Sequence, residues 1–241
     1  MIWLPFWALG QALLFVSMTP AVSSESPGAV PSALPLDQIV DRMQLHDAAQ
    51  SKDLKSYESI RHYQVQYHGF STLAGKMDVE VKFDAASGKS FRVIAQSGSR
   101  ILCDKVLMKA VTSEIEASLD KNAAAVSPAN YRFQLIGTEV LDGRPSYVLQ
   151  VEPLRAGKFL YRGKIWVDAV DFAVARIEVK PAKNPSFWIT STVIDSTSAK
   201  TDGAWLPQKN RSESKIRVGG TAVFTIDYGS YRVALADGGK L

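Results

Sequence analysis

The hydrophobic pattern of the chain is dominated by a two-residue alternation that is clearest in residues 157–192. Apolar side chains stand at alternate positions in 159–167 and again in 173–179, and Asp168 and Asp171 separate the two runs. Successive side chains of a strand point to opposite faces, so this period predicts two strands joined by a hairpin turn. A third strand is expected from Phe187 onward, which makes the stretch a three-stranded antiparallel meander.

The same alternation predicts strands on both sides of this meander. They are expected in 63–68, 77–84, 91–95, 131–141, 144–153, 205–218 and 221–233. Such clean alternation indicates a sheet with one solvated and one covered face. The chain therefore contains about ten antiparallel strands, and the twist of so long a sheet should curl it into an unclosed barrel.

Two segments, 36–55 and 100–125, have a helical period instead. The first carries an apolar stripe made by Leu36, Ile39, Val40 and Met43. The second repeats apolar residues at steps of four, at Cys103, Leu107, Val111, Ile115 and Leu119. Both are amphipathic, so we expect these two helices to cover the concave apolar face of the sheet. The predicted fold class is α+β, mainly β: a large curved antiparallel sheet covered by two helices.

The N-terminal region differs from the rest in composition. Residues 2–18 are almost wholly apolar and are followed by small residues, which predicts a secretory signal peptide over 1–23. A retained membrane anchor is the alternative, because no Lys or Arg precedes the apolar run. Residues 24–35 contain three prolines and suit a flexible linker, 36–235 form one domain, and 236–241 form a frayed tail.

Charge and cysteine content narrow the class of protein. The net charge is +4, and the basic residues are scattered along the chain. This charge permits a weak attraction to anionic lipid headgroups, and we find no nucleic-acid-binding motif. The single cysteine, Cys103, excludes an internal disulfide, and its place on the apolar stripe of its helix predicts a buried, inert thiol.

No pattern of reactive residues indicates an enzyme. The sequence has no HExxH, CxxC, GxSxG or glycine-rich phosphate loop. His62 and His68 lie on one predicted strand at a separation of roughly 20 Å, too far for one metal ion, and with His46 they are expected at the surface. Asp168 and Asp171 are either a carboxylate pair or, the interpretation we favour, turn-forming residues. We expect no catalytic activity, metal or cofactor.

The aromatic residues give the remaining signal. Tyr131 and most of the other aromatic residues of the strands stand at positions expected to face inward. Together with two apolar residues of the second helix they define a candidate apolar cavity: Tyr63, Tyr67, Phe83, Phe91, Leu107, Val111, Phe133, Tyr147, Phe159, Tyr161, Phe224 and Tyr228. The pattern is equally compatible with a filled hydrophobic core and with a hollow that binds a ligand.

Three short motifs carry a resemblance to a known family: GKIWVD at 163–168, DFAVARIE at 171–178 and WLP at 205–207. With the order of helix, meander, helix and long meander, they make residues 36–233 similar to the bacterial outer-membrane lipoprotein-sorting group, which includes LolA, LolB and RseB. These motifs are structural, and no lid or gating residue of the family can be matched to a position here.

The resemblance implies an incomplete barrel with a helical lid, whose apolar hollow receives acyl chains. It further implies a monomeric periplasmic protein whose partners are lipoproteins or lipid acyl chains, with transient contacts to a membrane or to envelope proteins. Anchoring to the inner membrane is the alternative location. An RseB-like sensor that binds a regulatory protein is the alternative function, and an enzyme with an unrecognised site is the third.

Overall fold

The computed structural model describes residues 34–119, 121–184 and 186–236. The predicted signal peptide 1–23 lies outside these residues, as do most of the predicted linker and tail. Within the described part of the chain, no helix has both the length and the apolar character needed to span a membrane.

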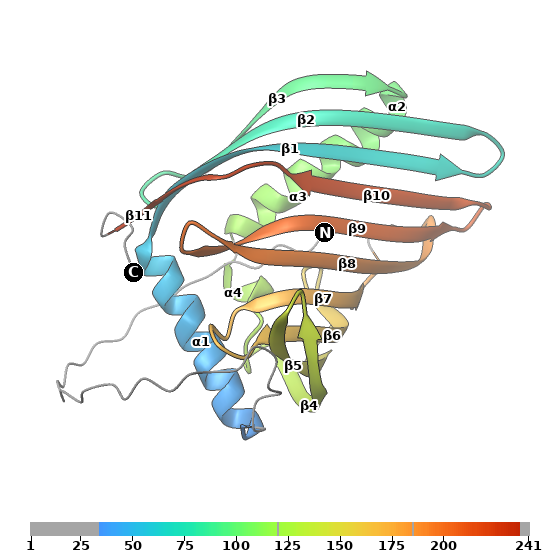
Figure 1. Ribbon diagram of the computed structural model, residues 1–241. Coiled ribbons are helices and arrows are strands. Elements are labelled where there is room, and N and C mark those ends of the chain that lie inside the picture. Colours follow the sequence, from blue (N-terminus) through green and yellow to red (C-terminus); the bar gives the residue numbers. More distant parts are fainter. Residues whose placement is uncertain (1–33, 120, 185, 237–241) are drawn as a thin grey trace, which may run out of the picture.

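One antiparallel sheet of eleven strands forms the body of the molecule (Figure 1). Its strands are β1 (Leu54–His68), β2 (Thr72–Asp84), β3 (Gly88–Gly98), β4 (Tyr131–Leu141), β5 (Arg144–Pro153), β6 (Tyr161–Asp168), β7 (Val174–Pro181), β8 (Ile189–Thr201), β9 (Ala204–Ile216), β10 (Thr221–Tyr228) and β11 (Arg232–Leu235). The strand order is β3-β2-β1-β10-β9-β8-β7-β6-β5-β4, and β11 pairs with β1. β3 and β4 are the two edges, so the sheet is unclosed, as predicted.

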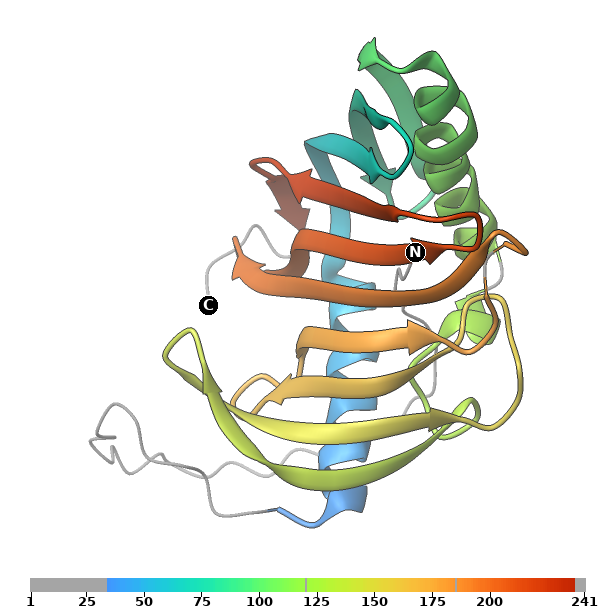
Figure 2. The same ribbon diagram turned by 90° about the vertical axis from the view of Figure 1, so that its right-hand side faces the viewer.

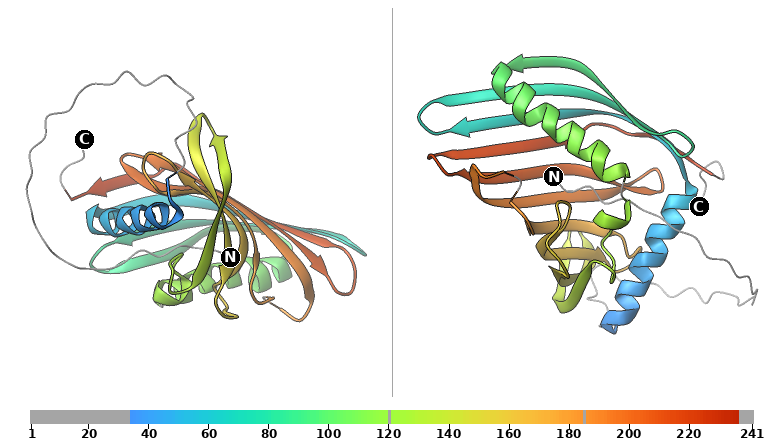
Figure 3. Two further views of the ribbon diagram at one scale, coloured as in Figure 1. Left: turned by 90° about the horizontal axis from the view of Figure 1, so that it is seen from below. Right: turned by 180° about the vertical axis from the view of Figure 1, so that it is seen from behind.

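The helices are α1 (Leu36–Asp53), α2 (Arg100–Leu102), η1 (Cys103–Leu107), α3 (Met108–Leu119) and α4 (Lys121–Ala124). Figure 2 shows α1 running across the lower strands of the sheet, and Figure 3 (right) shows the α2–α3 run crossing the upper strands. The two helical segments therefore cover one face of the sheet, and the predicted fold class is confirmed. The first helix ends two residues earlier than predicted, because Leu54 and Lys55 already belong to β1.

The second helical segment is not the single regular helix that 100–125 predicted. A π-helical turn, η1, separates α2 from α3. Beyond it the buried positions are spaced by three and four residues, so that Glu114 is buried while Ile115 is 40% exposed. The prediction of Ile115 on the buried stripe was wrong, because steps of four drift by about 40° per step from an α-helical face.

Two hydrophobic clusters lie under the helices. The first packs α3 and η1 against β1, β2, β9 and β10, and it includes Tyr63, Val65, Val79, Leu107, Val111, Phe224 and Ile226. The second packs α1 against β4–β8, and it includes Ile39, Met43, Tyr147, Leu149, Tyr161, Ile165, Ile177 and Ile194. The two helical segments thus cover different strands of the sheet. The predicted central meander lies mostly in the second cluster, beneath α1.

A seam runs between these two halves of the sheet. β7 and β8 pair only where Arg176–Val179 lies opposite Ile194–Thr197, over four residue pairs, whereas β8 pairs with β9 along almost its whole length. The concave face of β8 and β9 beside the seam is polar, with Thr192, Ser196, Asn210, Ser212 and Ser214 among its side chains. The apolar surface of the concave face is therefore divided into two by a polar strip.

Two predicted strand starts were too early. β6 begins at Tyr161, because residues 157–160 form a turn in which the Leu160 amide donates to the Gly157 carbonyl at 3.4 Å. Leu160 is buried there, and Phe159 is left partly exposed outside the strand. β8 begins at Ile189, and Phe187 stands in the loop before it. Alternation alone does not tell whether the backbone has a neighbouring strand to pair with.

Candidate ligand-binding site beneath the helices

A cavity of about 110 Å³ lies at the seam, between the C-terminal half of α1 and the concave face of the sheet. Its walls come from α1, β1, β7, β8, β9 and β10, and are made by His46, Asp47, Gln50, Leu54, Tyr57, Ala173, Val174, Arg176, Ile177, Ser196, Ser198, Trp205, Leu206, Pro207 and Tyr228. Most of this lining is apolar, with a few polar groups on the α1 side and along β8. That combination is typical of sites for small amphipathic molecules.

α1 supplies the polar wall of the cavity. Burial raises the pKa of the partly buried Asp47 carboxyl well above its usual value, since no hydrogen bond or ion pair to Asp47 offsets the loss of water within the described chain. Burial also lowers the pKa of His46, although the Asp171 carboxylate opposes this effect. The prediction that His46 is a surface residue was wrong, because the stripe of α1 extends far enough round the helix to place it against the sheet.

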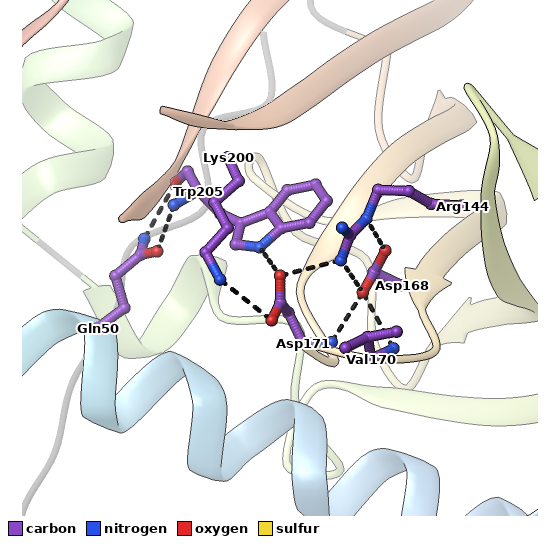
Figure 4. Close-up of polar contacts among 7 residues, drawn as sticks. All are labelled: Gln50, Arg144, Asp168, Val170, Asp171, Lys200 and Trp205. Atoms are coloured by element: carbon purple, nitrogen blue, oxygen red, sulfur yellow. Dashed lines mark hydrogen bonds and ion pairs between the residues drawn. The ribbon is translucent and has the colours of Figure 1, made fainter. Parts of the chain in front are cut away.

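Gln50 fastens α1 to the strand below it. The Gln50 side chain donates to the Trp205 carbonyl at 3.0 Å, and its oxygen accepts from the Trp205 amide at 2.6 Å (Figure 4). Because β9 and α1 belong to different halves of the molecule, this double hydrogen bond connects the halves at the cavity wall.

The β6–β7 turn forms a polar cluster at one end of the seam (Figure 4). Asp168 is fully buried, accepts from the backbone amides of Val170 and Asp171, and forms a two-bond ion pair with Arg144 at 2.6 and 2.8 Å. Asp171 accepts from the Trp205 indole at 2.9 Å and from Lys200 at 3.2 Å. The two aspartates are turn-forming residues, as we favoured, and they also connect the β6–β7 turn to the β8–β9 hairpin.

A buried ion network fixes α3 to the sheet. Arg61 of β1 has no exposed surface, and its Nη1 donates to both carboxylate oxygens of Glu114 at 2.8 and 2.7 Å. Lys89 of β3 approaches the same carboxylate at 3.3 Å. Burial disfavours the Glu114 carboxylate, but the charges of Arg61 and Lys89 outweigh it and lower the pKa of Glu114. The guanidinium of Arg61 also lies 4.8 Å from the centre of the Tyr228 ring.

Several polar atoms beside this network make no hydrogen bond of good geometry among the described residues. They are the Nε and Nη2 atoms of Arg61 and the hydroxyl oxygens of Tyr57, Ser59 and Tyr63. Burial raises the pKa of Tyr63 to about 12. Unpaired buried polar atoms are costly, so this region is less stable in its present packing than a fully hydrogen-bonded interior would be.

The structure distributes the predicted cavity residues over both clusters. Tyr63, Leu107, Val111, Phe224 and Tyr228 are buried in the first cluster, with Phe83 and Phe91 packed on it. Tyr131, Tyr147 and Tyr161 are buried in the second, with Phe133 packed on it. Tyr67 is half-buried and donates to the Gly219 carbonyl at 3.0 Å, and Phe159 is half-buried outside the sheet. Tyr228 alone among the predicted residues lines the cavity, so most of the aromatic side chains fill a core.

Sequence reasoning missed the charged residues of the interior. Arg61 stands at an inward position of its strand, between Ser59 and Tyr63, and this interruption of an apolar face was a usable signal. Glu114 could not be recognised, because its burial follows from the phase of α3 after the π-helical turn. Asp47 and His46 lie beside the apolar stripe of α1 and carry no motif.

The other predicted reactive residues have structural surroundings. Cys103 is a buried free thiol, as predicted, beside the carbonyls of Lys76 and Ser97. His62 and His68 are exposed on β1, and His62 contacts Asp78 at 2.8 Å. Within the described residues, no three His, Cys, Asp or Glu side chains are arranged to hold a metal ion.

Comparison with known proteins gives structural likenesses of low identity. No family model matches the chain, and no curated protein matches it by sequence. A DUF1329 family protein from Desulfovibrio piger is 16% identical, with 83% of this chain and 93% of that chain covered and a TM-score of 0.42. A LolA superfamily protein from Nitrosomonas europaea is 12% identical, with 83% and 94% covered and a TM-score of 0.40.

An outer-membrane lipoprotein-sorting protein domain from Vibrio parahaemolyticus is 10% identical, with 81% of this chain and 91% of that chain covered and a TM-score of 0.39. Two of these three names are those of the group that the sequence motifs resemble. All three TM-scores are below 0.5.

Proposed function

We propose that the protein binds the acyl chains of a lipid or lipoprotein beneath α1 and α3 and carries them through the periplasm. The observation that carries this proposal is the cavity at the seam, which is mainly apolar and is covered on one side by a helix. A carrier must release its cargo, and a cover made of helices can move away without breaking the hydrogen bonds of the sheet.

The present arrangement corresponds to a closed state in this proposal. The cavity measures about 110 Å³, well below the range of roughly 300–1,000 Å³ typical of ligand sites. A long acyl chain therefore requires α1 or α3 to move outward. The polar strip on β8 and β9 supports such a movement, because hydroxyl and amide side chains lie between the two apolar clusters there, with Ile194 as an apolar residue among them.

The Arg61–Glu114 ion pair favours the closed state. It is a buried polar contact between α3 and the strands below, and the hydroxyls of Tyr57, Ser59 and Tyr63 lie beside it. Opening exposes apolar surface of the sheet to water, which costs about 25 cal/mol per Å². Cargo that covers the same surface with its acyl chains would offset this free-energy cost. We propose that opening exchanges the contacts of α3 for contacts with acyl chains.

We further propose that the site binds its ligand without transforming it. His46 and Asp47 are the ionisable residues of the α1 wall, and they are neighbours in sequence, so their side chains leave the helix about 100° apart. This arrangement does not aim both groups at one substrate atom. Incubation with a lipid ester, followed by mass spectrometry, checks this point, and hydrolysis that depends on His46 would contradict it.

The experiment that tests binding uses a fluorescent fatty-acyl probe. Leu107 of η1 is fully buried in the first cluster, so Leu107→Asp places a carboxylate against the apolar face of the sheet and should weaken binding of the probe and reduce stability. Leu45→Asp is the matched control, because Leu45 lies on α1 with 68% of its surface exposed. Circular dichroism establishes that both variants are folded. A folded Leu107→Asp protein that binds the probe as well as the control does would refute the proposal.

A further inference from the structure

One end of the sheet gathers exposed apolar side chains at the tips of three connections. Phe70 in the β1–β2 turn is 89% exposed, Phe187 and Trp188 before β8 are 71% and 57% exposed, and Val218 in the β9–β10 turn is 56% exposed. We call these four residues the loop face. Antiparallel topology places all three connections at the same end, because β1, β7 and β9 all finish there (Figure 1).

The loop face is held together by contacts that pass through residues 217–220. The Arg217 amide donates to the Trp188 carbonyl at 2.8 Å, and the Arg217 Nε donates to the Phe187 carbonyl at 3.0 Å. The guanidinium lies 4.5 Å from the centre of the Phe187 ring, and the Phe187 and Trp188 rings meet edge to face at 5.5 Å. The Phe70 ring lies beside Gly219. The aromatic side chains are therefore presented in a fixed arrangement although they face water.

The segments that carry the loop face contain cations and no carboxylate side chain. The segments 67–76, 180–184, 186–190 and 214–221 contain no Asp or Glu, and their exposed cations are Lys76, Lys180, Lys183, Lys215 and Arg217. None of these five forms an ion pair with another residue of the described chain. Elsewhere on the surface the charges are interspersed, for example in the pairs Arg92–Glu80 and Arg232–Glu58.

We propose that the loop face docks on the surface of an anionic lipid bilayer. Exposed Phe and Trp at the tips of turns fit the boundary between headgroups and acyl chains, where aromatic side chains concentrate. Unpaired Lys and Arg beside them fit negatively charged headgroups. Projecting tips, rather than a groove or a flat patch, favour a fluid surface over a folded protein partner. This inference stands on the exposed surface alone and is independent of what the cavity binds.

Docking places the start of the second helical segment at the membrane. The Ser99 amide, directly before α2, donates to the Ala74 carbonyl of β2 at 2.7 Å, close to the β1–β2 turn. Ile101 of α2 is 71% exposed. The end of the helical cover that begins here therefore lies next to the docking surface.

The test is flotation of the full protein, as the cell exports and processes it, with vesicles of phosphatidylcholine alone or with about one third phosphatidylglycerol. We expect binding to the anionic vesicles only, and binding that weakens as salt is added. Phe187→Ser with Trp188→Ser should lower the partition coefficient by about tenfold or more. The matched control is Leu45→Ser with Val170→Ser, which removes exposed apolar residues that lie away from the loop face.

Neutralising two lysines of the loop face's surroundings gives an independent test of the same proposal. Lys183→Gln with Lys215→Gln should lower partition by about 25-fold, at about fivefold per charge, and Lys52→Gln with Lys55→Gln is the control of equal charge. The proposal is overturned if anionic vesicles do not bind the protein, which would leave the loop face to a protein partner. It is also overturned if face variants and controls bind equally, or if neutral vesicles bind as well as anionic ones.

Discussion

The buried pair Arg61–Glu114 allows the sharpest test of how α3 is fastened to the sheet. Arg61→Met keeps much of the side-chain volume but leaves the Glu114 carboxylate buried with only Lys89 near it, at 3.3 Å. Removing one partner of a buried pair typically costs about 3–5 kcal/mol, because the other charge stays out of water. In a domain of this size that loss corresponds to a fall in Tm of about 6–20 °C.

The double variant Arg61→Met with Glu114→Leu separates the pair from its surroundings. It removes both charges at once, and replacing a buried pair by apolar side chains is often neutral or stabilising. We therefore expect the double variant to be more stable than Arg61→Met alone. The assay is urea unfolding followed by circular dichroism on the wild type, both single variants and the double variant. Losses that simply add up would refute the reasoning that these two residues act as a pair.

Two further predictions follow from the seam. Burial raises the pKa of the Asp47 carboxyl above its value in the unfolded chain, so ionisation of Asp47 at neutral pH opposes folding. Asp47→Asn should therefore raise Tm at pH 7, and the gain should shrink toward pH 4. Thermal melts at pH 7 and pH 4 measure both effects. Trp205→Phe removes the indole hydrogen bond to Asp171 and should cost about 1–2 kcal/mol in urea unfolding, whereas Trp188→Phe at the exposed surface should cost nothing measurable.

Much of the fold was predictable because one face of the sheet is solvated. On β2 the residues Met77, Val79 and Val81 are buried while their neighbours are not, and such alternation fixes both the strand and its orientation. The turns at 142–143 and 202–203 also followed from their Asp-Gly sequences, and both aspartates adopt positive φ angles.

The site was less predictable, since it depends on contacts between residues far apart in sequence. The seam arises where β7 and β8 diverge, and both strands have ordinary alternating sequences that contain no sign of it. Likewise, Leu160 rather than Phe159 is buried because a turn at Gly157 changes the phase before β6. Whether aromatic side chains fill a core or enclose a hollow depends on how far the helices stand from the sheet, which no local pattern encodes.

The most direct test of the proposed carrier role is native mass spectrometry of the protein purified from the envelope without detergent. The proposal predicts a mass excess that corresponds to one bound amphiphile with an acyl chain, and loss of this excess in Leu107→Asp but not in Leu45→Asp. A protein that retains no amphiphile, and that does not take one up when vesicles of envelope lipid are supplied, would contradict the proposal that the helices cover a ligand site.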